Sequence, residues 1–311
     1  MFETLSRRLC MSALSILGIA AAAFGQRVAV APQYDTSHVY VAPGEVDDFA
    51  TSFLATFGGT STPQVIVTVT PTPSKTSSQL LQTPSGTVSL FGFQTGVPAP
   101  FGTERNGYLI TDMKTAIAKA RAVGADVIVT PFPDPIGVDA VVQWPGGVNM
   151  QLYWHTKAPS YAPFPYIPEN RVYVSESRLA AFEKAFLQFS DGKIASDDKN
   201  APGIEIGEPN STVHRVRIES AFGKMVIYAV NGHMVYPYGS ETTGYEVNNL
   251  DVTLAKAKKA GVAVLVPPVS LGDRRSAMVR FPGGYVAEIH QSLRANWDAR
   301  VVASHLHEAA H

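Results

Sequence analysis

Reactive side chains stand two residues apart at two places in this 311-residue chain. Glu288 and His290 form one pair, and Arg171 and Tyr173 form the other. Alternate residues of a β-strand project from the same face, so each pair would point to one side of a sheet. A carboxylate beside an imidazole can ligate a divalent metal or divide the work of general acid and base. Both pairs are therefore candidate site residues if their segments form strands.

The last five residues, His307 to His311, match the pattern H-E-x-x-H of zinc peptidases. That chemistry needs a buried helix, a third ligand and a substrate cleft. The second histidine is the final residue, where a chain end frays. We expect residues 293–311 to form a C-terminal helical tail rather than a zinc centre.

A duplication organises the elements that must position these residues. Residues 100–152 align without a gap with residues 237–289, and 17 of the 53 pairs are identical. The shared features include Pro-aromatic-Gly-hydroxyl-Glu, Gly-Tyr and a Pro-Gly-Gly turn. The spacing is far longer than the roughly 20 to 50 residues of a solenoid repeat. The chain therefore contains two copies of one domain.

Each copy is predicted to contain two βαβββ units. The expected helices follow the 3.6-residue period of apolar residues, and they cover 46–57, a segment from Asp112 to Gly124, 178–189 and a segment from about Asn249 to Gly261. The expected strands, rich in β-branched residues, are 37–41, 64–70, 77–82, 87–93, 107–110, 127–130, 140–143, 148–154 and 170–175. A proline-rich stretch at 158–168 is the expected linker.

Composition limits the partners and the location. The net charge is −1 and no basic stripe is present, which excludes nucleic acid as an expected partner. Residues 1–25 are typical of a signal peptide, because Arg7 and Arg8 precede an apolar run that ends at a small-residue cleavage site. We expect a protein exported to the periplasm or secreted, without a membrane anchor, by either the Sec or the twin-arginine route. Cleavage would remove Cys10, the only cysteine.

The stretches GYLITDMKTAIAKARAVGADVIV and GYEVNNLDVTLAKAKKAGVAVLV are each followed by a strand and Pro-Gly-Gly. Together with the four βαβββ units, they resemble the vicinal oxygen chelate superfamily of glyoxalase I, bleomycin-resistance proteins and extradiol dioxygenases. The resemblance implies an α+β fold with two tandem glyoxalase-like domains, residues 27–157 and 169–292, each with a cupped mixed sheet. The superfamily contains both enzymes and non-catalytic binders, so the resemblance leaves the reaction open.

In that superfamily, ligands sit on the first and last strands of each unit. In copy two these positions fall on Arg171, Val226 or Ile227, Thr242 and Glu288. Strand alternation then adds Tyr173, Glu246 and His290 to the same cavity. We expect the more reactive cavity here, with Glu288 and His290 as metal ligands, because copy one has uncharged residues where copy two has Glu246 and Glu288.

Copy one is the second candidate cavity. Its ligand positions fall on His38, Ser89 or Leu90, Arg105 and Gln151, and alternation adds Tyr40, Tyr153 and His155. Two histidines and a glutamine would hold a metal weakly, whereas Arg105 suits an anionic substrate. At the ligand positions that the resemblance implies, neither cup has the two histidines and one carboxylate that a non-haem iron dioxygenase needs. Glu104 and Glu241 stand at matching positions of the two copies, and strand alternation predicts that they face away from the cups unless a β-bulge re-aims them.

Two function classes follow. The first is an enzyme, a lyase, isomerase or dioxygenase, acting on a small oxygenated or aromatic substrate with a divalent metal or an acid–base pair. The second is a protein that sequesters a small ligand without catalysis, as bleomycin-resistance proteins do. The inward carboxylates favour the enzyme, and the incomplete metal set favours the binder.

Overall fold

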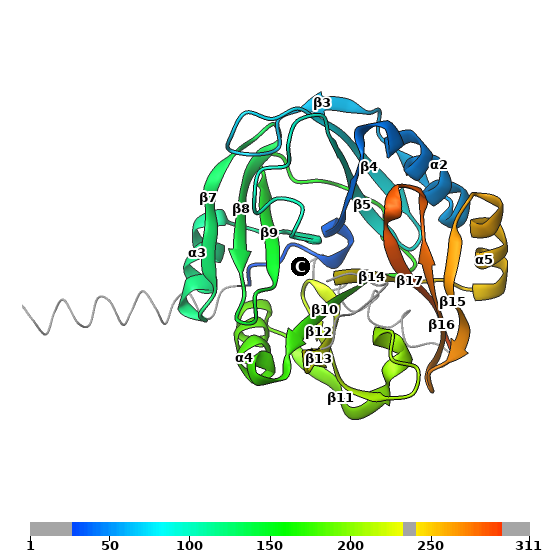
Figure 1. The fold of residues 1–311 in the computed structure, drawn as a ribbon. Helices are drawn as coiled ribbons and strands as arrows, with labels where there is room; N and C mark the ends of the chain where they lie inside the picture. Colours follow the sequence, from blue (N-terminus) through cyan, green and yellow to red (C-terminus); the bar gives the residue numbers. More distant parts are fainter. Residues whose placement is uncertain (1–26, 233–240, 294–311) are drawn as a thin grey trace, which may run out of the picture.

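The computed structural model describes residues 27–232 and 241–293, which form two curled sheets and four α-helices (Figure 1). The expected signal peptide and the H-E-x-x-H motif lie outside the described residues. So does the C-terminal tail beyond Leu293. In the described part of the chain, no helix is long and apolar enough to cross a membrane.

The first sheet has the strand order β2-β4-β5-β1-β6-β9-β8-β7, with β3 paired to β4. Its strands are β1 (Thr36–Val41), β2 (Thr60–Ser61), β3 (Val65–Val67), β4 (Thr76–Thr83), β5 (Gly86–Phe93), β6 (Asn106–Leu109), β7 (Asp126–Asp134), β8 (Gly137–Gln143) and β9 (Asn149–His155). The strand expected at 64–70 is mostly irregular, because it lies at the sheet edge between prolines and pairs only over the three residues of β3.

The second sheet repeats this order as β11-β12-β13-β10-β14-β17-β16-β15. Its strands are β10 (Glu169–Ser175), β11 (Lys193–Pro202), β12 (Thr212–Ser220), β13 (Gly223–Val230), β14 (Glu241–Glu246), β15 (Ala263–Ser270), β16 (Arg274–Arg280) and β17 (Val286–Ser292). Short 3₁₀ helices lie at Pro32–Tyr34, Pro43–Glu45, Glu176–Arg178, Gly203–Ile206 and Pro282–Gly284.

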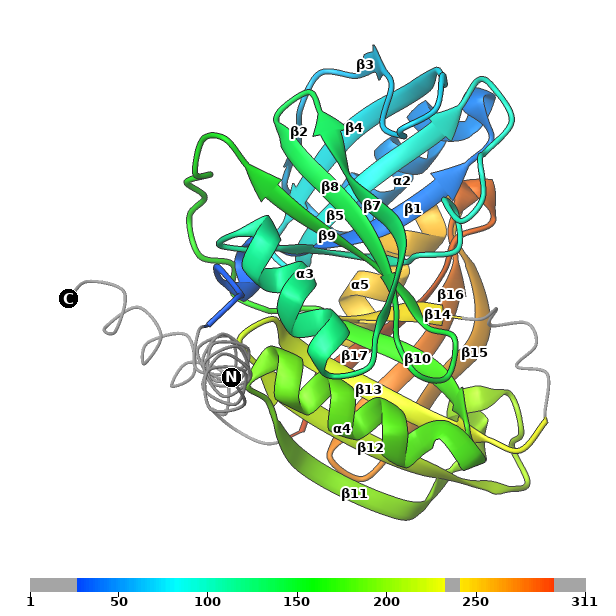
Figure 2. The same ribbon diagram turned by 90° about the vertical axis from the view of Figure 1, so that its left-hand side faces the viewer.

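The helices are α2 (Val46–Phe57), α3 (Met113–Ala122), α4 (Leu179–Ser190) and α5 (Leu250–Lys259). Two of them begin at the predicted caps, because Asp112 accepts a 2.7 Å hydrogen bond from the Thr115 amide and Asn249 a 3.0 Å bond from the Val252 amide. Helix α2 lies beside α5, and α3 lies beside α4 (Figure 2). One apolar core joins the first and fourth units, and another joins the second and third.

The strand registers of the two copies agree. Gly107 pairs with Gln151 in copy one as Gly244 pairs with Glu288 in copy two. Thr36 lies opposite Gly107, and Glu169 lies opposite Gly244. The prediction of an α+β fold made of four βαβββ units in two tandem domains is therefore confirmed, with each sheet assembled from two units.

Candidate functional site

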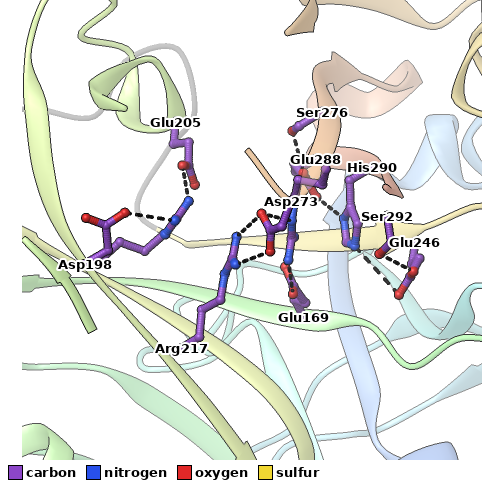
Figure 3. Close-up of polar contacts among 12 residues, drawn as sticks. Glu169, Asp198, Glu205, Arg217, Glu246, Asp273, Ser276, Glu288, His290 and Ser292 are labelled. Atoms are coloured by element: carbon purple, nitrogen blue, oxygen red, sulfur yellow. Dashed lines mark hydrogen bonds and ion pairs between the residues drawn. The ribbon is translucent and has the colours of Figure 1, made fainter. Parts of the chain in front are cut away.

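The inner side of the second sheet carries a buried chain of paired acids and bases (Figure 3). Glu288 lies at its centre, with none of its surface exposed. One carboxylate oxygen of Glu288 lies 2.7 Å from His290 Nδ1, and the other accepts a 2.5 Å hydrogen bond from Ser276. The Arg171 guanidinium lies 4.0 Å away. The two predicted metal ligands are therefore in contact with each other.

Glu169 is a second buried carboxylate beside Glu288. Its two oxygens accept hydrogen bonds of 2.6 and 2.9 Å from the two terminal nitrogens of Arg274. Both carboxylates approach Gly244, where a Cβ atom would lie 2.7 Å from Glu288 Oε2 and 3.4 Å from Glu169 Oε2. The absence of a side chain at Gly244 thus allows two carboxylates to share this part of the cup.

Glu246 completes the group on the other side of His290. One of its oxygens lies 3.9 Å from His290 Nε2 and 3.2 Å from the Lys224 ammonium, and the other accepts a 2.6 Å bond from Ser292. Glu246, Glu288 and His290 are thus brought together and buried, as the sequence predicted.

Arg171 and Tyr173 lie in a neighbouring aromatic cluster. The Arg171 guanidinium lies over the Tyr228 ring at 4.9 Å and donates a 3.2 Å hydrogen bond to the Glu205 carbonyl. The Tyr173 ring is 5.7 Å from that of Tyr228. Arg171 therefore links the cluster to Glu288, while Tyr173 packs with Tyr228.

These contacts determine the charge state of the carboxyls. Burial by itself raises the pKa of Glu288, but the charge and hydrogen bond of His290, with Arg171 and Arg274, lower it to about 2. Burial likewise opposes ionisation of Glu169, and Arg274 outweighs it and holds the pKa of Glu169 well below its usual range. Both groups are carboxylates at neutral pH.

Among the described residues, three buried side chains lie close enough together to be considered as ligands of one metal ion. Glu169, Glu288 and His290 each offer a ligand atom, and these atoms lie within 4.8 Å of one another. However, both oxygens of each carboxylate are already hydrogen-bonded, and the guanidinium of Arg274 is bidentate on Glu169. A dication would have to share Glu169 with that guanidinium. The donor set as it stands therefore does not fit a divalent metal.

The cavity beside these residues in copy two is small and charged. A cavity of about 200 Å³ lies beside the ion-paired chain and is bordered by Glu169, Lys224, Glu246, Arg274 and Ser292, among others. Of the five residues predicted for this site, Glu246 borders the cavity, whereas Arg171, Tyr173, Glu288 and His290 do not. That copy two is the more reactive cup stays a prediction.

Copy one contains the larger cavity, of about 470 Å³. Most of its wall is aromatic or aliphatic, and the apolar lining includes Tyr34, Val65, Val67, Val69, Leu80, Phe91, Phe101, Ile136 and Tyr161. Tyr40, Gln151 and His155 border it, whereas the predicted His38 and Arg105 do not. Polar side chains interrupt this mostly apolar wall, among them Thr36, Gln79, Ser89 and Asp139.

Asp139 is the buried acid of this cavity. Gln151 donates a 2.6 Å hydrogen bond to Asp139, but burial and the charge of Asp134 dominate and raise the pKa of Asp139 well above its usual range. Burial lowers the pKa of His155. The cavity thus combines a carboxyl whose pKa is raised with an imidazole whose pKa is lowered.

Glu104 lies on the inner side of copy one, and the expectation that it faces away is wrong. It is fully buried, accepts a hydrogen bond from the Tyr40 hydroxyl and lies 3.6 Å from His38 Nδ1. Arg105 lies over the Tyr40 ring at 5.6 Å. Strand alternation misplaced Glu104 because β6 begins only at Asn106, so residue 104 belongs to a loop. The side chain of the matching Glu241 lies outside the described residues.

Sequence reasoning missed Asp139, Glu169 and Arg274. Extending the alternation of Arg171 and Tyr173 by one step along the same strand would have found Glu169. Asp139 and Arg274 lie on the third strands of their units, where the superfamily's ligand positions gave no reason to look.

No family model and no curated protein matches the sequence. A mutant of 4-hydroxymandelate synthase from Streptomyces coelicolor is similar in structure, with a TM-score of 0.57 and 12% identity over 87% of this chain and 96% of that one. The 2,3-dioxygenase LapB from Pseudomonas sp. KL28 has a TM-score of 0.51 and 12% identity, over 86% of this chain and 92% of that one.

A fusion of a xylose isomerase-like TIM barrel with 4-hydroxyphenylpyruvate dioxygenase has a TM-score of 0.53 and 13% identity, over 90% of this chain and 52% of that one. At sequence identities of 12–13%, these similarities show a shared fold and nothing about the reaction. The shared architecture extends over both copies, since the matches cover most of the chain. This chain thus has the tandem fold of the vicinal oxygen chelate superfamily.

Proposed function

We propose that the protein is an enzyme that acts on a small aromatic molecule bearing a carbonyl or hydroxyl oxygen, bound in the copy-one cavity. The observation that carries this proposal is the cavity itself, about 470 Å³ in volume, with a mostly apolar wall interrupted by polar side chains. Small-molecule sites commonly have this size and composition. The similar structures named above include enzymes, which supports catalysis over simple storage.

The chemistry that the polar groups support is proton transfer. Asp139 keeps its proton because of burial, so it can donate to an oxygen of the substrate. His155 stays neutral because of burial, so it can accept a proton from carbon or oxygen. Two groups with pKa values displaced in opposite directions are suited to act as acid and base. This pair would serve an isomerase or a lyase.

Binding is tested by blocking the cavity. Ser89 borders it with a small side chain, so Ser89→Trp should fill it, while the exposed Ser177→Trp serves as the control for an added indole. Phenylacetaldehyde and 4-hydroxyacetophenone are the probes, and the thermal shift each produces is the readout. We expect the shift to vanish in Ser89→Trp and to persist in Ser177→Trp. Equal shifts in both variants would place binding elsewhere.

Catalysis is tested by proton exchange. In D₂O, the enzyme should accelerate loss of the α-hydrogen of phenylacetaldehyde, with His155 taking the proton from carbon and Asp139 donating to the carbonyl oxygen. Asp139→Asn and His155→Gln should each slow exchange about 100-fold, within the usual range for general acid–base groups. NMR measures the rate.

Sequestration without catalysis is the second candidate. In its favour, Asp139 and Tyr40 are already hydrogen-bonded within the protein, to Gln151 and Glu104, so a ligand could bind without reacting. Binding in the thermal-shift experiment without exchange in the NMR experiment would identify it.

Export is also part of this proposal. The motivation is the arginine pair, the apolar run and the Ala-x-Gly site in residues 1–25. Mass spectrometry of the periplasmic or secreted fraction should find a mature chain that begins near Gln26. An intact Met1 in that fraction would contradict it.

A further inference from the structure

We propose that the guanidinium of Arg274 takes the place of a divalent cation in copy two, so that this cup is a latent metal site closed by a side chain. The inference concerns the other copy and is independent of the proposed function. It rests on the geometry around Glu169, Glu288 and His290.

The three potential ligands lie close enough together to share one metal ion. Their ligand atoms lie within 4.8 Å of one another, they come from β10 and β17, and all three are buried. An imidazole and two carboxylates are donors that first-row divalent metals accept. What separates this group from a metal site is the bidentate Arg274, which is itself only 8% exposed.

Charge explains why a cation is required there. A buried carboxylate is costly unless a cation or hydrogen bonds compensate it, and Glu169 and Glu288 lie side by side across Gly244. Arg274 compensates Glu169 through two hydrogen bonds, while His290 and Arg171 compensate Glu288. A metal ion added to this arrangement would compete with the Arg274 guanidinium for the Glu169 carboxylate. The metal ion and the guanidinium therefore exclude each other.

The matched positions in copy one support the same reading. The ungapped repeat places Gly137 where copy two has Arg274, and the registers place Thr36 where copy two has Glu169. Gln151 stands in the place of Glu288. Copy one therefore lacks both members of the ion pair, and its cup contains the larger cavity. The Glu169–Arg274 ion pair therefore distinguishes the cup of copy two, which has the smaller cavity, from the cup of copy one, which lacks the pair and has the larger cavity.

The experiment removes the guanidinium and supplies a metal. CoCl₂ is the probe, because its visible absorption reports coordination by protein ligands. The variants are Arg274→Met, which removes the charge at similar length, and Arg280→Met, the same change at an exposed position of the same strand. Arg274→Met should bind one equivalent of Co²⁺ at least 100-fold more tightly than the wild type, and Arg280→Met should match the wild type. Adding Glu288→Gln to Arg274→Met should abolish the gain.

Each outcome decides the proposal. Tight stoichiometric binding by the wild type, or a folded Arg274→Met variant that binds no better, overturns it. If Arg274→Met does not fold without metal, it is refolded in the presence of CoCl₂. A folded, cobalt-bound variant then supports the proposal, and a variant that stays unfolded overturns it. The melting temperature of the wild type should be unaffected by either CoCl₂ or a chelator. A chelator that lowers it shows a resident metal and overturns the proposal.

Discussion

Gly283, in the turn between β16 and β17, lies against Val41 at the end of β1 in the other copy. A Cβ atom added at Gly283 would lie 2.5 Å from Val41 Cγ1. The contact is reciprocal, because a Cβ at Gly146 would lie 2.8 Å from Val174 Cγ1 at the corresponding strand of copy two. The Pro-Gly-Gly turn shared by both copies therefore joins the two domains.

The adjacent glycines of each turn allow a matched test. Gly283 and Gly284 both have positive φ, of 78° and 83°, but a Cβ at Gly284 would meet open space. Both alanine variants suffer the backbone strain, and only Gly283→Ala suffers the clash. We expect Gly283→Ala to lower the free energy of unfolding by about 1–3 kcal/mol more than Gly284→Ala. Urea denaturation measures the difference, and Gly146→Ala against Gly147→Ala should repeat it. Equal losses would mean that the turn relaxes.

A second prediction concerns Asp139 in the copy-one cavity. Its pKa is raised on folding, so its contribution to stability is fully present below the pKa of the unfolded state and is lost as the pH rises. Asp139→Asn should therefore stabilise the fold at pH 7 by roughly 1–3 kcal/mol and have little effect near pH 4. Urea denaturation across this pH range measures it, with the exposed Asp126→Asn as control. Destabilisation at pH 7 would show that Asp139 is ionised.

Sequence alone predicted the architecture well because local signals and the repeat agreed. The helix over residues 46–57 has the predicted bounds, and Asp112 and Asn249 cap their helices. These features depend on residues close together in the chain. The prediction of a strand over residues 64–70 was wrong for all but three residues. Pairing at a sheet edge depends on the neighbouring strand, and local propensity carries no information about that neighbour.

The site was predictable only in part. Strand alternation correctly placed Glu288 beside His290, since both lie on one strand. It gave no means to see that Arg274, 105 residues from Glu169, would neutralise that carboxylate, or that Glu104 would turn inward from a loop to meet Tyr40. Contacts between distant elements decide which cup is filled and which is open.

A third prediction follows from the low pKa of Glu288. A carboxyl whose pKa falls from 4.5 to about 2 on folding contributes stability that is present above pH 4.5 and is lost as the pH falls toward 2. That contribution is on the order of 3 kcal/mol. Glu288→Gln should be less stable than the wild type at pH 7, and the gap should narrow below pH 4. Acid titration monitored by circular dichroism measures it, and the exposed Glu176→Gln should follow the wild type.

The last prediction concerns Tyr40 and Glu104. The Tyr40 hydroxyl is the hydrogen-bond donor seen on this fully buried carboxylate, and His38 lies near it without a hydrogen bond. Tyr40→Phe leaves the acceptor buried without its donor, which should cost about 1–3 kcal/mol. Glu104→Leu removes the acceptor and leaves the hydroxyl facing the cavity.

If the pair interacts as the structure shows, the double variant should be less destabilised than the sum of the single changes, by about 1–2 kcal/mol. The four free energies of unfolding, measured in urea at pH 7, give this coupling. Strict additivity would mean that Tyr40 and Glu104 are not bonded in solution. The thermal-shift experiment with the two ligand probes should then be repeated on Tyr40→Phe. If this variant binds only the hydroxylated probe more weakly than the wild type does, the Tyr40 hydroxyl contacts the ligand.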